Sequence, residues 1–177
     1  ILAMVGSRDF NYPGFGAVNV ATSKRQPGSS IKPFTYAQLF YKDDWGAGSV
    51  ILDTPKTWPG SPEPYSPKNA DGKFFGPMTV REALDTSRNL PAVKALEITG
   101  VDSMIELANN MGDESLCNSC NYGLSVTLGA GEVKLSEHTQ AYASFARGGV
   151  AKPSTSILKV VKSNGDVLEE WKDKAGQ

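Results

Sequence analysis

The sequence contains little of what metal, redox and nucleic-acid chemistry require. It has 2 cysteines and 1 histidine among 177 residues, fewer than a four-ligand zinc site needs. The charges almost cancel, with 18 Lys plus Arg against 19 Asp plus Glu, and no basic block could follow a phosphate backbone. We therefore expect no metal, no cofactor and no nucleic-acid partner.

Long apolar runs are also missing. No stretch of about 18 apolar residues could form a membrane span, and the N-terminus lacks the charged and apolar regions of a secretory signal. The composition, 40% apolar and 21% charged, is that of a folded domain. The chain opens directly on an apolar run, which predicts a strand over Ile1–Ser7, so we expect a fragment cut at that strand.

The two cysteines form a single C-x-x-C, at Cys117 and Cys120. Thioredoxin-like chemistry places such a pair at the head of a helix that follows a strand. Here the pair lies between Gly112 and Gly123 among Asn and Ser residues. We expect a local structural disulfide or two idle thiols, and a redox or adhesion domain built around this pair is the weakest functional hypothesis.

Hydrophobic periodicity and capping signals predict mostly helices, with one hairpin at the end of the chain. A helix should begin near Ser29 or Ser30, because proline at position 33 is tolerated only in a first turn. An Asn-Gly centre at Asn164–Gly165 predicts a hairpin. The expected segments are a loop over 53–77, helices over 79–84, 91–98, 101–111 and 132–146, and hairpin strands over 157–162 and 167–171.

The first chemical motif is an S-x-x-K that begins at Ser29 and ends at Lys32. Residues three apart on a helix share a face, so the lysine amine lies beside the serine hydroxyl. A serine becomes a nucleophile when a base takes its proton, and a lysine is such a base when its surroundings lower its pKa. The helix N-terminus disfavours the lysine's proton and offers N–H groups to an oxyanion.

The same patterns occur a second time in the sequence and serve as controls. Another S-x-x-K, Ser156–Lys159, falls in a predicted strand, where residues three apart point to opposite faces. An S-x-N occurs at Ser87–Asn89 and again at Ser119–Asn121, in the cysteine loop. Only the first copy of each pattern has a context suited to catalysis. For Ser87 and Asn89, helix capping is the alternative role.

Four stretches in this order resemble the transpeptidase domain of the bifunctional, class A penicillin-binding proteins. The first carries the nucleophile motif, the second precedes the S-x-N motif, the third contains it, and the fourth is similar to the helix downstream of it. The stretches are Arg25–Phe34, Tyr65–Asn69, Thr79–Val93 and Leu128–Ala146. The resemblance extends over nearly the whole chain.

The resemblance implies an α/β fold of the α+β type, the penicillin-binding protein and serine β-lactamase-like transpeptidase fold. Its antiparallel sheet is flanked by helices and is incomplete here, so residues 1–177 would be the N-terminal portion of one domain. In the site, Ser29 would be the acylated nucleophile, with its N–H in the oxyanion hole, and Lys32 its general base. Ser87 would relay a proton to the leaving group, and Asn89 would bind the substrate backbone.

The implied reaction is acyl transfer by a serine-type D-Ala-D-Ala transpeptidase or carboxypeptidase. A peptidoglycan stem peptide would acylate Ser29 and lose its last residue, and an amine of a neighbouring strand would take the acyl group. β-Lactam antibiotics would be trapped at the acyl stage. The family also implies the extracytoplasmic face of the bacterial cell membrane, reached through an N-terminal anchor that this sequence does not contain.

One family motif is missing from the sequence. No K-[ST]-G occurs; the nearest strings are Lys56–Trp58 and Lys162–Asn164. In the family this motif lies on a sheet strand that supplies the second oxyanion donor, and one such donor contributes about 10²–10³ in rate. We expect stable folding only with the missing C-terminal half of the domain, as a second chain or an extension, and the isolated fragment to be inactive. The alternative function is a catalytically silent module that binds peptidoglycan peptides or scaffolds cell-wall partners.

Overall fold

A computed structural model describes residues 1–42, 44–117 and 120–172 of the chain. The chain divides into two compact units, each described by itself below. The central unit comprises Gln26–Ala108 and Leu116–Glu132, and the terminal unit comprises Ile1–Arg25, Asn109–Ser115 and Val133–Gln177.

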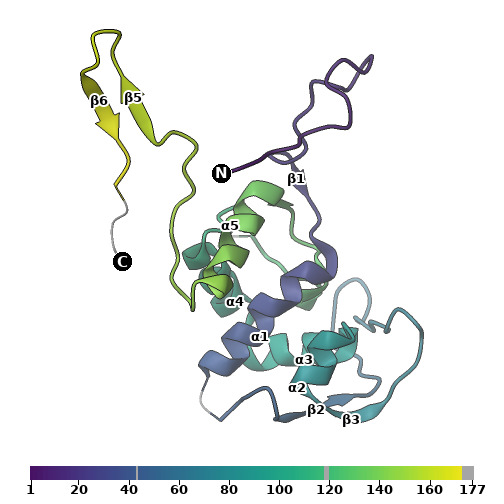
Figure 1. Ribbon diagram of the computed structural model, residues 1–177. Coiled ribbons are helices and arrows are strands. Elements are labelled where there is room, and N and C mark those ends of the chain that lie inside the picture. Colours follow the sequence, from purple (N-terminus) through teal and green to yellow (C-terminus); the bar gives the residue numbers. More distant parts are fainter. Residues whose placement is uncertain (43, 118–119, 173–177) are drawn as a thin grey trace. The chain divides into compact units, whose positions relative to one another are not determined.

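The described elements are five α-helices, two 3₁₀ helices and six short strands. Figure 1 labels the α-helices and most of the strands. In chain order they are β1 (Lys24–Arg25), η1 (Gly28–Ile31), α1 (Lys32–Tyr41), β2 (Val50–Asp53), β3 (Gly76–Thr79), α2 (Val80–Asp85), α3 (Asn89–Thr99), α4 (Val101–Met111), η2 (Leu124–Leu128), β4 (Val133–Lys134), α5 (Leu135–Ala146), β5 (Lys159–Val161) and β6 (Val167–Glu170). No helix in this described part of the chain is long and apolar enough to cross a membrane.

The core of the central unit forms around α1, which packs against α3. The helical segment begins with η1 and continues directly into α1, with proline in the first turn, as the sequence predicted. A first cluster of buried residues joins α1, α2, α3 and β2: Tyr36, Leu39, Ile51, Val80, Ala83, Ala92 and Ala95. A second cluster consists of Trp58, Leu90 and Val93, covered by Tyr65, Leu124 and Leu128.

The pairing of β2 with β3 fixes where α2 begins and where the long loop between the two strands ends. They pair antiparallel, with Val50 opposite Thr79 and Asp53 opposite Gly76. Thr79 then begins α2 through the predicted capping box, since its side chain accepts from the N–H of Glu82 while Glu82 accepts from the N–H of Thr79. The predicted loop between the two strands is confirmed, and a single antiparallel bridge joins Trp58 to Tyr65 within it.

The terminal unit contains α5, the β1–β4 pair and the β5–β6 hairpin. The predicted hairpin is confirmed, with Lys162 N–H donating to the Asp166 carbonyl around Gly165, whose φ is 92°. The helix expected from Glu132 begins three residues later, because Val133 and Lys134 pair with β1 instead. Many apolar side chains of the terminal segments are exposed, among them Leu2, Val5, Phe10, Phe15, Ile157, Leu158 and Leu168.

The α+β fold class is confirmed, because helices combine with antiparallel strand pairs throughout the described residues. These strands form three separate two-stranded sheets. The strand predicted over Ile1–Ser7 is wrong: this segment has no regular structure. A β-strand requires a neighbouring strand to satisfy its backbone N–H and C=O groups, and none of the described strands pairs with this segment.

Candidate active site

The S-x-x-K motif lies at the junction of η1 and α1 in the central unit. Ser29 is in η1 and exposed, while Lys32 is the first residue of α1 and fully buried. The Lys32 N–H donates to the Ser29 carbonyl, which makes the two residues part of one continuous helical segment. Ser29 therefore lies in the first helical turn, where backbone N–H groups have no acceptor within the helix.

The amine of Lys32 reaches the S-x-N segment, which lies 55 to 57 residues further along the chain. Lys32 Nζ donates to the Ser87 carbonyl at 2.7 Å, to Asn89 Oδ1 at 2.7 Å and to Ser87 Oγ at 3.2 Å. The structure thus brings together three of the four predicted site residues. The fourth, Ser29, is adjacent in the helix, and no hydrogen bond joins its hydroxyl to Lys32 among the described contacts.

These acceptors determine what the amine of Lys32 can do. The Ser87 carbonyl and Asn89 Oδ1 can only accept, so each must receive an N–H from Lys32 whether the amine is charged or neutral. A neutral amine has two N–H groups and one lone pair. The two carbonyl oxygens therefore hold both N–H groups, and the lone pair is left to accept a proton from a hydroxyl.

The electrostatic environment favours the neutral amine. Burial away from water, as the larger cause, and the nearby positive charge of Arg88 together lower the pKa of Lys32 from 10.5 to about 8. At pH 7 most of the amine is still protonated, and a rise of one pH unit increases the neutral fraction several-fold. A lysine with such a pKa can act as a general base close to neutral pH.

Ser87 lies in the tight turn between α2 and α3. Its φ is 54°, in the left-handed region that non-glycine residues seldom occupy. The turn is fixed on its α2 side, since Ser87 N–H donates to the Leu84 carbonyl and Arg88 N–H to the Ala83 carbonyl. This conformation directs both the carbonyl and the hydroxyl of Ser87 to Lys32.

Asn89 is held on both sides. Its Oδ1 accepts from Lys32, and its Nδ2 donates to the Lys68 carbonyl at 2.8 Å. The start of α3 is capped by another residue, because Asn69 Oδ1 accepts from the N–H groups of Asn89 and Leu90. Helix capping, the alternative role of the Asn89 and Ser87 side chains, is therefore wrong. Arg88, the residue before α3, makes no capping hydrogen bond with its side chain, and Asn69 caps the helix instead.

Sequence reasoning missed a buried network around Arg88. Arg88 Nε donates to Asp53 at 2.9 Å, and Asp53 is fully buried at the end of β2. The same Asp53 carboxylate accepts from Asn69 Nδ2 at 2.7 Å. Arginine and aspartate usually lie on the surface. Nothing in the sequence around Arg88 or Asp53 indicates that these two residues are buried against each other.

Two glycines fix the turn that precedes the nucleophile. Gly129 has a φ of 93°, and a Cβ on it would lie 2.3 Å from the nitrogen of Gly28. Only glycine allows η2 to approach η1 this closely. A buried hydrogen bond of 2.7 Å between Thr35 and Thr127 also ties α1 to η2. The position of Ser29 is therefore set by η2 as well as by its own helix.

The remaining candidate residues lie outside this site. In the second S-x-x-K, Ser156 precedes the hairpin and Lys159 forms an ion pair with Glu170 at 3.3 Å. Ser119 of the second S-x-N lies outside the described residues. Cys117 and Cys120 form a disulfide, with a Cα–Cα distance of 5.2 Å. Among the described residues, no group of three or more His, Cys, Asp or Glu side chains could hold a metal ion.

Known proteins are similar to this chain over most of its length. The family model of the penicillin-binding protein transpeptidase domain matches residues 1–175. Penicillin-binding protein 1A of Neisseria cinerea is 33% identical over 168 residues, which are 93% of this chain and 20% of that protein. The chain belongs to the penicillin-binding protein transpeptidase family. It spans about a fifth of the length of this relative.

Solved structures show the same fold. The crystal structure of penicillin-binding protein 1A from Haemophilus influenzae matches with a TM-score of 0.78 at 31% identity, over 88% of this chain and 23% of that one. PonA1 from Mycobacterium tuberculosis, solved in complex with penicillin V, matches with a TM-score of 0.77 at 23% identity, over 86% and 43% of the two chains. The predicted transpeptidase fold, incomplete in this chain, is confirmed.

Proposed function

We propose that these residues belong to a peptidoglycan DD-transpeptidase that works through an acyl-enzyme on Ser29 and is acylated by β-lactams. The observation that supports this most is the contact of the buried Lys32 amine with the S-x-N segment, 55 to 57 residues away. A chance S-x-x-K has no reason to bury its lysine against two carbonyl oxygens and a serine hydroxyl. The family supports the same reaction in general.

In this mechanism the neutral amine of Lys32 accepts the proton of the Ser29 hydroxyl. The Ser29 oxygen attacks the carbonyl carbon of the penultimate D-Ala of a stem peptide, and the N–H of Ser29 stabilises the oxyanion that forms. The peptide bond then breaks and the terminal D-Ala leaves as an amine. Its proton comes from Lys32 through the Ser87 hydroxyl, which already lies 3.2 Å from Nζ.

An amine of a neighbouring strand then attacks the acyl carbon, and Lys32 accepts the proton that this amine loses. The bond between the acyl carbon and Ser29 breaks, and Lys32 returns the proton to the Ser29 oxygen. Water in place of the amine gives the carboxypeptidase reaction. Asn89 positions the substrate backbone with the amide hydrogen that is not bound to the Lys68 carbonyl. A β-lactam acylates Ser29 in the same way, but its leaving amine stays tethered, so the acyl-enzyme persists.

The chain's partners follow from this reaction. They are peptidoglycan stem peptides, β-lactams, and the C-terminal half of the same domain, of which residues 1–177 form the N-terminal portion. The site faces the extracytoplasmic side of the bacterial membrane, where its substrate lies. No cofactor or metal enters the mechanism, because lysine and serine carry every proton.

The test is the mass of the intact protein after incubation with penicillin V. It uses the longest natural chain that carries these 177 residues. A gain of one penicillin mass that is lost in Ser29→Ala supports the proposal, and Ser156→Ala, from the second S-x-x-K, is the matched control that keeps the adduct. An unmodified wild-type protein overturns the proposal in favour of the catalytically silent, peptide-binding module.

A further inference from the structure

The central residue of the S-x-N segment, Arg88, is almost fully buried, with 6% of its surface exposed. The positive charge of Arg88 therefore lies inside the protein, although arginine is usually a surface residue. Its guanidinium makes three polar contacts: Nε with Asp53 at 2.9 Å, one amino group with Asp71 at 2.9 Å, and the other with the Lys73 carbonyl. A buried charge is tolerated only with such a complete set of partners.

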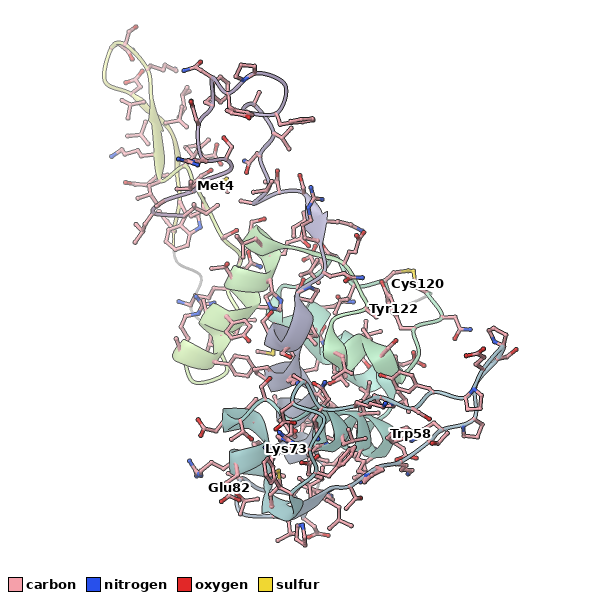
Figure 2. All side chains as sticks on the ribbon, turned by 90° about the vertical axis from the view of Figure 1, so that its right-hand side faces the viewer. Met4, Trp58, Lys73, Glu82, Cys120 and Tyr122 are labelled. Carbon is pink, nitrogen blue, oxygen red and sulfur yellow. A yellow bond between two sulfur atoms is a disulfide. The ribbon has the colours of Figure 1, made fainter. Side chains whose placement is uncertain are left out.

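The partners of Arg88 come from different parts of the central unit. Asp53 ends β2, whereas Asp71 and Lys73 lie in the loop before β3. Lys73 is labelled in Figure 2, on the ribbon of the central unit. The ring of Phe75, from the same loop, covers the guanidinium with its centroid 4.5 Å away. Arg88 therefore joins the turn between α2 and α3 to β2 and to this loop.

The same network reaches Asn89 along a second path. Asp53 accepts from Asn69, and Asn69 caps α3 at Asn89 and Leu90. Asn69 also donates to the Lys73 carbonyl, which Arg88 contacts as well. The residues on both sides of Arg88, Ser87 and Asn89, are the two that hold the amine of Lys32. Any movement of Arg88 moves both groups relative to Lys32.

The geometry points to Arg88 as a positioning residue, which holds the Ser87 carbonyl and the Asn89 amide on Lys32 through its contacts with Asp53, Asp71 and the Lys73 carbonyl. This inference rests on the proposed function. It assigns to the middle position of S-x-N a role in setting the geometry of the base, in addition to the two residues that touch it. Arg88 itself contacts neither Lys32 nor Ser29 among the described interactions.

The charge of Arg88 has a separate effect, which makes the role measurable. Burial is the larger cause of the lowered pKa of Lys32, and the positive charge of Arg88 lowers that pKa as well. The charge of Arg88 is itself faced by Asp53 and Asp71. Removing the charge raises the pKa of Lys32, so the neutral base forms only at higher pH. In a plot of acylation rate against pH, the part of the curve where the rate rises (the rising limb) then moves to higher pH. A simple loss of folded protein lowers the rate but does not move this limb.

The experiment measures the rate of acylation by penicillin V between pH 6 and pH 10 in the longest natural chain. Arg88→Lys keeps the charge but not the planar fork. We expect it to slow acylation about ten- to a hundredfold with the limb unmoved. In Arg88→Met we expect at least the same slowing, with the limb at higher pH. Arg81→Met, an exposed arginine on α2, is the matched control that keeps the wild-type rate and limb.

A second variant covers the case in which Arg88→Met does not fold, since it leaves the buried Asp53 unpaired. Asp71 is half-exposed, so Asp71→Asn weakens one contact of Arg88 without burying a lone charge. A loss of a few-fold in rate is expected. Wild-type rates and limbs in both Arg88→Lys and Asp71→Asn overturn the inference. A wild-type protein that penicillin V does not acylate overturns the proposed function instead, so the two failures are distinguishable.

Discussion

The two units of this chain bury their apolar residues to very different extents. In the central unit, Phe34, Leu39, Leu90 and Leu96 are completely buried. In the terminal unit, Leu2 is fully exposed and Phe10 is 73% exposed. The candidate site lies wholly in the central unit, where the positions of Lys32, Ser87 and Asn89 are set by packed helices. Catalytic geometry of this kind requires rigid supporting elements.

The terminal segments have the apolar pattern of buried strands, yet many of their described apolar side chains are exposed. Hairpin residues Ile157, Leu158 and Leu168 are each at least 60% exposed. Two-stranded hairpins are marginal in water without a third strand or a helix against them. A local sequence pattern is therefore sufficient for the turn of the hairpin, whereas burial of the hairpin's apolar side chains depends on additional strands. We propose that the C-terminal half of the domain supplies them.

The largest effect is expected at the base of the mechanism. Lys32→Met removes the proton acceptor, and acylation by penicillin V should fall about 10²–10⁴-fold. The matched control is Lys159→Met, since Lys159 is the lysine of the second S-x-x-K, in the terminal unit. A time course of the intact mass measures both rates. Equal losses in the two variants would contradict the assignment of the base to the central unit.

Proteolysis compares the two units directly. Where the central unit of the 177-residue chain is folded, chymotrypsin should cut at the exposed Phe10, Tyr12 and Phe15 about 10²-fold or more faster than at the buried Phe34 and Tyr36. Equal rates at all five sites would show that this chain folds only together with the C-terminal half of the domain. Cleavage at a buried site requires opening, and each 1.4 kcal/mol of opening free energy slows it about tenfold. Mass spectrometry of the early fragments gives the two rates.

The same digestion tests the proposed completion of the domain. In the longest natural chain, the terminal segments should become protected, because further strands cover their apolar residues. Protection of Phe10, Tyr12 and Phe15 in the longer chain is the expected result. Equal cutting at these positions in the two chain lengths would show that the terminal segments are open surface in the complete protein as well.

The smallest effects concern two glycines with positive φ, one in each unit. Gly129→Ala should lower the free energy of unfolding by more than about 1–3 kcal/mol. The added Cβ would collide with the backbone of Gly28, and the positive φ is also unfavourable for alanine. Acylation should slow too, since Ser29 follows Gly28. At Gly148, with φ of 66° and no atom within 4 Å of an added Cβ, only the φ cost of about 1 kcal/mol remains. Urea denaturation distinguishes the two; equal costs would mean that η2 does not hold η1.

Much of the local structure could be predicted because its causes are local. The capping box of Thr79 and Glu82 requires only residues three apart, and the hairpin turn requires only Asn164 and Gly165. The bounds of α4 agree with the prediction, with Gly112 at its end. The start of α5 could not be predicted, because Val133 and Lys134 pair with residues more than 100 positions away.

The candidate site likewise has features with local causes and features that depend on contacts between distant segments. That a serine and a lysine share one helical turn follows from the sequence alone, because residues three apart lie on the same face of a helix. Three features became known only from the folded chain: this lysine contacts Ser87 and Asn89, Arg88 and Asp53 are buried together, and Asn69 caps α3. Hydrogen bonds and burial between distant segments depend on the path of the whole chain, and residue spacing alone does not specify that path.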